Sequence, residues 1–298
     1  MRTSIDGTGV AIVTPFHNYG TVDFTSLEKI INHVIDGGVD FILALGTTSE
    51  AATLSSDEKT AVVNFVLEIV NKRIPVMVGC STNSTHSAID MIKSENFDGI
   101  EAILSVVPYY NKPNQKGLYN HFKMIASASP VPVILYNVPG RTCTNITAET
   151  ALRLAKDFDN IAGIKEASGN MNQVMTILRD RPKDFKVFSG DDMLTFPLMT
   201  MGADGVISVA AMGYPKEFSE MVRLLKKKKY NKALEIHFSL MEFVEDIFAD
   251  GNPGGIKAAL SMMDLLKYNM RLPLVKVNKA LQINIQNFIN NYRSPLDH

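Results

Sequence analysis

The sequence is poor in cysteine and has no hydrophobic run long enough to cross a bilayer. The two cysteines, Cys80 and Cys143, have no metal-ligand spacing, so neither a disulfide framework nor a cysteine-based metal centre is predicted. The N-terminus lacks the basic segment followed by an apolar one that marks a secretory signal. We therefore expect a soluble, cytoplasmic protein.

A net charge of one sign is also missing. The 30 lysines and arginines nearly cancel the 31 aspartates and glutamates, which gives no electrostatic case for binding nucleic acid or an acidic membrane. The basic run Lys226–Lys229 lies in a helical segment with acids before and after it, so we interpret it as a solvated helix face. Hydrophobic residues make up 46% of the chain and are spread evenly, which predicts a large core.

The dominant pattern is an apolar run of strand length followed by a longer stretch with helical periodicity, repeated along the chain. About eight such units in some 200 residues predict a (β/α)₈ barrel, the TIM-barrel architecture of the α/β class. The predicted strands are Gly9–Thr14, Phe41–Leu45, Pro75–Gly79, Gly99–Val107, Val133–Asn137, Ala162–Glu166, Lys186–Ser189 and Gly205–Ala210. The predicted helices between them are Leu27–Ile35, Asp57–Val70, Ser87–Ser94, Gly117–Ala128, Ala148–Phe158, Met171–Leu178 and Leu194–Met201.

A doubly wound open sheet is the rival fold. It is disfavoured because Thr14-Pro15-Phe16 follows the first strand where a dinucleotide-binding half would have a glycine-rich fingerprint. We expect the barrel to occupy residues 1–215, with its last helix continuing to about residue 230. Residues 231–298 are predicted to form a C-terminal helical extension packed on the barrel, since no linker-like stretch precedes them. The helices predicted after the eighth strand are Lys216–Phe248 (one helix or two), Ile256–Leu266 and Leu274–Ile289.

Lys165 lies near the end of the sixth predicted strand, in the sequence Gly163-Ile164-Lys165-Glu166-Ala167. Because side chains alternate along a strand, Gly163 and Ala167 flank the lysine on its own face and leave room for a ligand. Apolar surroundings disfavour the charged form of a lysine, and a neutral amine attacks carbonyl groups to form a Schiff base. The alternative interpretation is a structural ion pair at the barrel rim.

Polar residues also follow other strands, at the end of the barrel where active sites are built. After the second strand, Thr47 and Thr48 offer hydroxyl and backbone N–H groups to a carboxylate, although an ordinary turn explains them as well. After the fourth come Tyr109 and Tyr110, which packing against a neighbouring element or subunit would also explain.

The fifth strand ends at Tyr136-Asn137, and Val138-Pro139-Gly140-Arg141 follows. The Tyr136 phenol is a candidate proton carrier, and the Arg141 guanidinium suits bidentate binding of a carboxylate, with a surface salt bridge as the alternative. After the seventh strand, Asp191 and Asp192 have no third acid or histidine nearby in sequence, so we interpret them as a helix N-cap and a first-turn acid rather than a metal site. Together these residues describe a site for a small carboxylate-bearing carbonyl compound that is activated as an imine.

Three segments resemble the signatures of the dihydrodipicolinate synthase (4-hydroxy-tetrahydrodipicolinate synthase) family: Gly46–Glu50, Tyr136–Thr142 and Gly163–Glu166. The resemblance runs from about Gly7 to Asp264 with the spacing intact. This family belongs to the pyruvate-dependent class I aldolases. The resemblance implies a lyase of lysine and diaminopimelate biosynthesis that condenses pyruvate with L-aspartate 4-semialdehyde, followed by cyclisation.

The resemblance also implies the roles of individual residues. Lys165 would form the Schiff base with pyruvate, and Arg141 would bind the semialdehyde carboxylate. The remaining roles fall to Thr47 and Thr48 on the pyruvate carboxylate, to a proton relay of Tyr136, Thr48 and Tyr110 with the last residue donated by a neighbouring subunit, and to the main chains of Gly190 and Ile207 as the lining. A homotetramer built as a dimer of dimers and the absence of any metal or organic cofactor are implied as well.

Two departures from the family pattern have consequences. Ser49 stands where the family has glycine, so a left-handed conformation at that position would be strained. Ser56, Lys59 and Ser87 stand where lysine-inhibited members carry two histidines and a glutamate, although Asn83 and Tyr109 match. An added ammonium and a missing carboxylate disfavour cationic lysine. We therefore expect weak or absent inhibition by L-lysine, and a micromolar inhibition constant in a turnover assay would contradict this.

Two other functions fit parts of the pattern. A sialic acid (N-acetylneuraminate) lyase or a 2-keto-3-deoxy sugar acid aldolase of the same superfamily would keep Lys165 and Tyr136 but would not need Arg141. A non-enzymatic barrel that only binds a keto acid would form no imine. Borohydride reduction in the presence of pyruvate separates this last class, because a protein without imine chemistry gains no mass.

Overall fold

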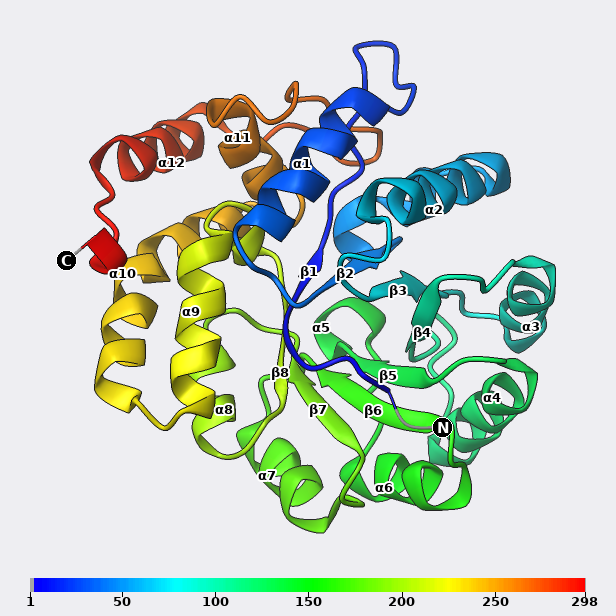
Figure 1. Ribbon diagram of the computed structural model, residues 1–298. Coiled ribbons are helices and arrows are strands. Elements are labelled where there is room, and N and C mark those ends of the chain that lie inside the picture. The colour runs from blue at the N-terminus through cyan, green and yellow to red at the C-terminus, as the bar shows by residue number, and fades with distance from the viewer. Residues whose placement is uncertain (1–2, 298) are drawn as a thin grey trace. The chain divides into compact units, whose positions relative to one another are not determined.

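The computed structural model describes residues 3–297, in which eight parallel strands form a closed barrel in the order β1 to β8 (Figure 1). The (β/α)₈ prediction is confirmed, and all eight predicted strands are present. The differences lie at the ends: β1 stops at Ala11 and β8 at Ser208, earlier than predicted. The strands are β1 Gly7–Ala11, β2 Phe41–Ala44, β3 Val76–Gly79, β4 Ile100–Val106, β5 Val133–Asn137, β6 Ile161–Glu166, β7 Lys186–Ser189 and β8 Gly205–Ser208.

Contacts within the chain group it into two compact units. The first combines the segment ending at Asp6 with Pro75–Ile207, and the second combines Gly7–Ile74 with the described residues from Ser208 onward. The predicted division into a barrel to residue 215 and an extension from residue 231 stays a prediction.

In the first unit the strands β3 to β8 pair in parallel. The register places Tyr136 of β5 opposite Lys165 of β6, and Asn137 opposite Glu166. Almost every residue of these strands is buried, which explains why they read as continuous apolar runs in the sequence. The helices of this unit are α3 Thr85–Ser94, α4 Gln115–Ala128, α5 Pro139–Thr142, α6 Ala148–Asp157, α7 Met171–Asp180 and α8 Thr195–Thr200.

In the second unit β1 pairs with β2, and helices make up most of the remainder. The predicted Lys216–Phe248 segment is two helices, which Figure 1 shows side by side in yellow. Lys227–Lys229 form the turn between them, so this basic run is exposed, as predicted, but lies largely outside the helices. The helices of this unit are α1 Phe24–Asp36, α2 Ser56–Val70, α9 Pro215–Lys226, α10 Tyr230–Ala249, α11 Gly254–Met262 and α12 Lys279–Asn291.

Several helix ends follow from local signals in the sequence. Ser55 and Glu58 form a capping box at the start of α2, Thr147 caps α6, and Gly37 ends α1. The prediction for the start of α8 was wrong in detail. The Asp191 carboxylate accepts from the backbone N–H groups of the two residues before the helix, at 3.0 and 3.2 Å, and the N-cap position is Leu194.

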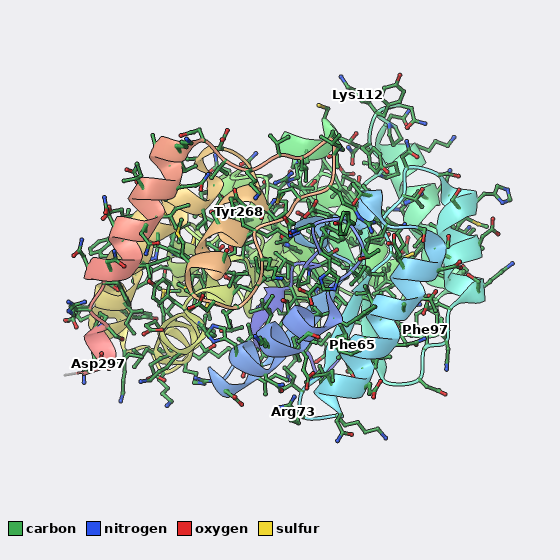
Figure 2. All side chains as sticks on the ribbon, turned by 90° about the horizontal axis from the view of Figure 1, so that it is seen from above. Phe65, Arg73, Phe97, Lys112, Tyr268 and Asp297 are labelled. Carbon is green, nitrogen blue, oxygen red and sulfur yellow. The ribbon has the colours of Figure 1, made fainter. Side chains whose placement is uncertain are left out.

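The last helix also begins later than predicted, at Lys279 rather than Leu274. Asn278 is its N-cap, with a side chain that accepts from the Leu281 N–H at 3.0 Å. The segment before it is irregular and is held by Tyr268, whose hydroxyl accepts from the Val277 N–H at 2.7 Å (Figure 2). Within the described residues, no helix combines the length and the apolar character that a membrane span requires.

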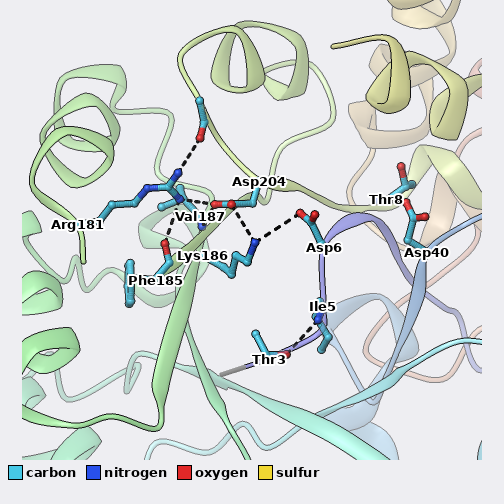
Figure 3. A network of polar contacts seen from close by, with 11 residues as sticks. Thr3, Ile5, Asp6, Thr8, Asp40, Arg181, Phe185, Lys186, Val187 and Asp204 are labelled. Atoms are coloured by element: carbon cyan, nitrogen blue, oxygen red, sulfur yellow. Dashed lines mark hydrogen bonds and ion pairs between the residues drawn. The ribbon is translucent and has the colours of Figure 1, made fainter. Parts of the chain in front are cut away.

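An ion-pair network joins the N-terminal segment to the start of β7 (Figure 3). The Lys186 ammonium lies 3.2 Å from one Asp204 oxygen and 3.9 Å from an oxygen of Asp6, and Arg181 forms a short ion pair with Asp204. Asp204 also accepts from the Val187 N–H at 2.8 Å. The side chains of Arg181, Lys186 and Asp204 are only partly exposed. Their ion pairs therefore hold the starts of β7 and β8 more firmly than fully exposed pairs would.

His121 of α4 is a buried histidine whose titration makes stability depend on pH. Its Nδ1 atom lies 2.9 Å from the Thr85 hydroxyl, and burial lowers its pKa from 6.5 to about 4. Between these values the unfolded chain binds the proton and the folded chain does not, so stability is fully present above pH 6.5 and falls as the pH drops toward 4. We expect the free energy of unfolding to lose about 2 kcal/mol from this group between pH 7 and pH 5.

Denaturant unfolding at the two pH values would measure this loss. The variant His121→Gln has no imidazole, so its unfolding free energy should depend less on pH by that amount. An unchanged pH dependence in the variant would contradict the assignment to His121.

Candidate active site

Lys165 and Tyr136 lie together at the C-terminal ends of neighbouring strands. Their side chains are 6% and 5% exposed, and the lysine Nζ lies over the tyrosine ring, 4.6 Å from its centroid. Tyr136 and Lys165 lie opposite one another in the paired strands β5 and β6. Residues paired in this way present their side chains on the same face of the sheet, which produces the contact. A buried amine beside a phenol can act as a nucleophile with a proton carrier at hand.

Gly190, which follows β7, leaves the space that the lysine side chain fills. A Cβ atom at this position would come within 3.0 Å of Cε and 3.1 Å of Cγ of Lys165, and within 2.7 Å of Cβ of Ala167. Any larger residue would therefore displace the lysine. Ile207 on β8, the other predicted lining residue, is 1% exposed.

Arg141 belongs to the four-residue helix α5, which the strand and helix patterns did not predict. Pro139 starts this helix, and Cys143 ends it in a left-handed conformation with φ of 53°. The single proton of the Thr142 hydroxyl has two carbonyl acceptors within reach, Thr144 at 2.9 Å and Val138 at 3.1 Å, which tightens the turn. The Arg141 side chain is exposed, so its guanidinium is available to an anion.

Tyr110 lies in the loop after β4 and is 89% exposed, whereas its neighbour Tyr109 is 38% exposed. Lys112 marks this loop in Figure 2 and is also exposed. Tyr110 and Lys112 both have positive φ angles, of 75° and 46°. An aromatic side chain held this far out in solvent contributes nothing to the packing of its own chain.

Thr48 sits in a turn of 3₁₀ helix, Thr47–Ser49, directly after β2. It is 2% exposed, and its hydroxyl accepts a hydrogen bond of 2.9 Å from the Asn252 side-chain amide, whereas Thr47 is exposed. Ser49 donates from its hydroxyl to the Gly46 carbonyl at 2.7 Å. The left-handed residues of this loop are Leu45, with φ of 54°, and Glu50, with φ of 56°; Ser49 is not among them, so the strain that glycine's absence suggested there does not arise.

Glu50 directly follows the Thr47–Ser49 turn and anchors it through a buried cluster of charged side chains. Its carboxylate forms a short ion pair with Lys257, and both side chains are fully buried. It also accepts from the Arg271 N–H at 3.2 Å. Lys257 lies over the Phe16 ring at 4.3 Å from the centroid, and burial lowers the pKa of this lysine to about 8. Lys257 is thus a second buried lysine, but a carboxylate holds its ammonium.

Sequence reasoning identified the residues at the strand ends and missed the partners that hold them. Asn252 and Lys257 come some 200 residues after the residues they bind, and nothing local marks either as a partner of Thr48 or Glu50. The one available signal is a lysine within the otherwise apolar helix α11, because a lysine at a core position needs a buried acid. In residues 3–297, no three or more histidine, cysteine, aspartate or glutamate side chains are grouped as a metal site requires.

Known proteins resemble the chain over nearly its whole length. The 4-hydroxy-tetrahydrodipicolinate synthase of Flavobacterium psychrophilum is 52% identical over 275 residues, which cover 92% of this chain and 94% of the relative. A profile of the dihydrodipicolinate synthetase family matches residues 4–292. The chain belongs to this family. It is a lyase of the class I aldolase type, as the sequence predicts, and its family functions in lysine and diaminopimelate biosynthesis.

Solved structures of the family support the same assignment. The pyruvate complex of the chloride-inhibited dihydrodipicolinate synthase of Acinetobacter baumannii is 41% identical, with a TM-score of 0.93, and the match covers 96% of this chain and 98% of that one. A monomeric dihydrodipicolinate synthase variant is 39% identical, with a TM-score of 0.94 and coverage of 96% on both sides. The predicted synthase activity is confirmed, and the alternative of a sialic acid or sugar acid aldolase is not favoured.

Proposed function

We propose that Lys165 is the nucleophile that condenses pyruvate with L-aspartate 4-semialdehyde through a Schiff base. The observation that carries the proposal is the contact of its buried Nζ with the Tyr136 ring, in the space left by Gly190. The neutral amine attacks the pyruvate ketone, and water leaves as the imine forms. Loss of a proton from the pyruvate methyl group gives an enamine, whose carbon attacks the aldehyde.

The semialdehyde's own amine then closes the ring. It attacks the imine carbon and displaces the Lys165 amine, which restores the enzyme and releases the cyclic product. Hydrolysis of the imine is the alternative route for the lysine. The whole reaction joins the two substrates and releases one molecule of water, so no oxidant is required, and in this proposal the covalent imine activates pyruvate in place of a metal or organic cofactor.

The proton transfers fall to Tyr136, Thr48 and Tyr110. The Thr48 hydroxyl accepts from Asn252, which leaves its own proton free to be donated onward. Tyr110 is almost fully exposed in the single chain, and we propose that it enters the relay of a neighbouring subunit in a homotetramer built as a dimer of dimers. This would explain why an aromatic side chain is held in solvent.

The two substrate carboxylates have separate partners in this proposal. Thr47 and Thr48 bind the pyruvate carboxylate with hydroxyl and N–H groups, and the main chains of Gly190 and Ile207 line the site. Arg141 binds the carboxylate of the semialdehyde with its exposed guanidinium. We place the reaction in the cytoplasm.

Pyruvate consumption by the purified protein tests the substrate assignment. One reaction contains L-aspartate 4-semialdehyde and the other N-acetylmannosamine, the acceptor that a sialic acid lyase would use. Consumption only with the semialdehyde supports the proposal. Consumption only with the amino sugar would overturn it and move the protein to the lyase branch.

The variant Arg141→Ala should lose the reaction with the semialdehyde but still form the imine with pyruvate. We expect kcat/KM for the semialdehyde to fall at least about 100-fold, because a charge-assisted bidentate contact is removed. Formation of the reducible pyruvate adduct should change little, since Arg141 does not bind pyruvate. Steady-state kinetics and borohydride trapping measure the two steps, and an equal loss of both would contradict this role.

A further inference from the structure

A buried polar network lies directly behind the two strand ends that carry Lys165 and Tyr136. Glu166 follows the lysine, is 2% exposed, and points to the opposite face of β6. Its carboxylate accepts from Asn137 at 3.1 Å, from the Ser168 N–H at 2.8 Å and from the Gln173 amide of α7 at 3.0 Å. Asn137 follows Tyr136 on β5 and is fully buried.

The same network also includes the segment that follows Arg141 in the chain. Asn145 lies four residues after the arginine, and its side-chain oxygen accepts from Asn137 at 2.8 Å and from Gln173 at 3.2 Å. Its amide donates to the Gln173 oxygen at 2.9 Å. The next residue, Ile146, donates its N–H to Asn137 at 3.1 Å and accepts from Gln173 at 3.2 Å.

Two side chains connect these groups: Asn137 of β5, and Gln173 of α7, which joins them from outside the two strands. The Gln173 amide nitrogen, with two N–H groups, lies within hydrogen-bond distance of three acceptors: Glu166, the Asn145 side-chain oxygen and the Ile146 carbonyl. Its amide oxygen accepts from Asn145. An amide can do this because it carries both donors and an acceptor, whereas a carboxylate or an ammonium at this position would leave one set of partners unmatched. The buried carboxylate of Glu166 strengthens the bonds that it accepts.

We propose that Gln173 is a positioning residue that holds Arg141 in register with Lys165 and thereby sets the affinity for the second substrate. Helix α5 has only four residues, so its own hydrogen bonds cannot fix the direction of an exposed arginine. The short segment that carries Arg141 must therefore be held in place at its two ends. One end is β5, which pairs with the lysine strand, and the other is Asn145–Ile146, which Gln173 ties to Glu166 on that same strand.

The test is the variant Gln173→Ala, with Thr176→Ala as its matched control. Thr176 lies three residues on in the same helix and, like Gln173, is partly buried. In the contacts described it bonds only within α7, where its hydroxyl donates to the Asn172 carbonyl at 3.0 Å. We expect Gln173→Ala to raise the KM for the semialdehyde about tenfold, while the rate of pyruvate adduct formation stays within about twofold. The control should change neither quantity. Asn145→Ala, which removes the other half of the link, should repeat the result if the first variant folds poorly.

A double-mutant cycle with Arg141→Ala separates positioning from general damage. If Gln173 acts through Arg141, its removal should have little further effect on the semialdehyde KM once the arginine is gone. An additive tenfold loss, a result for Gln173→Ala equal to the control, or an equal loss of pyruvate adduct formation would each overturn the inference.

This inference rests on the proposed role of Arg141, and the two can fail separately. If Arg141→Ala leaves the semialdehyde kinetics unchanged, the proposed role of the arginine is wrong, and the positioning role falls with it. If Arg141→Ala has its expected effect and Gln173→Ala has none, only the positioning role is wrong.

Discussion

Replacing Lys165 with alanine is expected to abolish the pyruvate adduct and to lower kcat at least about 1000-fold, because covalent catalysis has no substitute nucleophile at this position. The residual rate would come from binding alone. The variant should remain folded, since the lost ammonium has no carboxylate partner among the ion pairs described and the vacated space is bordered by Tyr136 and Gly190. Mass spectrometry after borohydride reduction with pyruvate measures the adduct directly.

Two further lysine variants make this result specific. Lys165→Arg keeps a long basic side chain, but its guanidinium is not a nucleophile at neutral pH, so it should be as inactive as the alanine variant. Lys156→Ala, in the exposed last turn of α6, should leave both the adduct and the turnover unchanged. An adduct that persists in Lys165→Ala and maps to another lysine would refute the assignment.

The fold could be predicted because strand-length apolar runs alternate clearly with helical stretches along the sequence. The apolar runs are clear because the strands are buried on both faces. The limits of β5 and β7 match the prediction, since polar residues mark where the apolar run of each strand stops: Asn137 ends β5, and Lys186 and Ser189 bound β7. Predictions failed where polar groups decide the ends of elements. Helix α5 was missed because a four-residue helix has no periodicity to detect, and Asp191 was misplaced because it caps a turn before α8 rather than the helix itself.

The candidate site was partly predictable for a different reason. Parallel strands bring their carboxyl ends to one end of a barrel, so Lys165 and Tyr136 could be proposed from their places at the ends of β6 and β5, whereas the role of Thr48 was implied by the family resemblance. Their supporting residues could not be chosen in this way. Asn252 reaches Thr48 and Gln173 reaches Asn145 only after distant segments have folded together, and a single sequence carries no signal of such pairing.

The largest expected effect on stability comes from Lys257. Replacing it with methionine keeps most of the unbranched side chain but removes the ammonium that pairs with the fully buried Glu50 carboxylate. Removing one partner of a buried ion pair costs about 3–5 kcal/mol of unfolding free energy, mainly because the remaining charge is desolvated and unpaired. Denaturant unfolding at pH 7 measures this loss, below the pKa of about 8 at which the folded protein's Lys257 gives up its proton.

The double variant Lys257→Met with Glu50→Gln distinguishes that cause from lost packing. A neutral amide at position 50 removes the unpaired charge, so most of the stability should return, although the bond to the Arg271 N–H is kept only by the amide oxygen. Arg179→Ala, which breaks the exposed pair with Asp180, should give no measurable change. If Lys257→Met loses no more than this surface variant, the buried pair does not stabilise the fold. If the double variant recovers stability without activity, Glu50 is needed at its own position beside Thr47–Ser49, and the charge cluster then serves the threonine turn as well as the core.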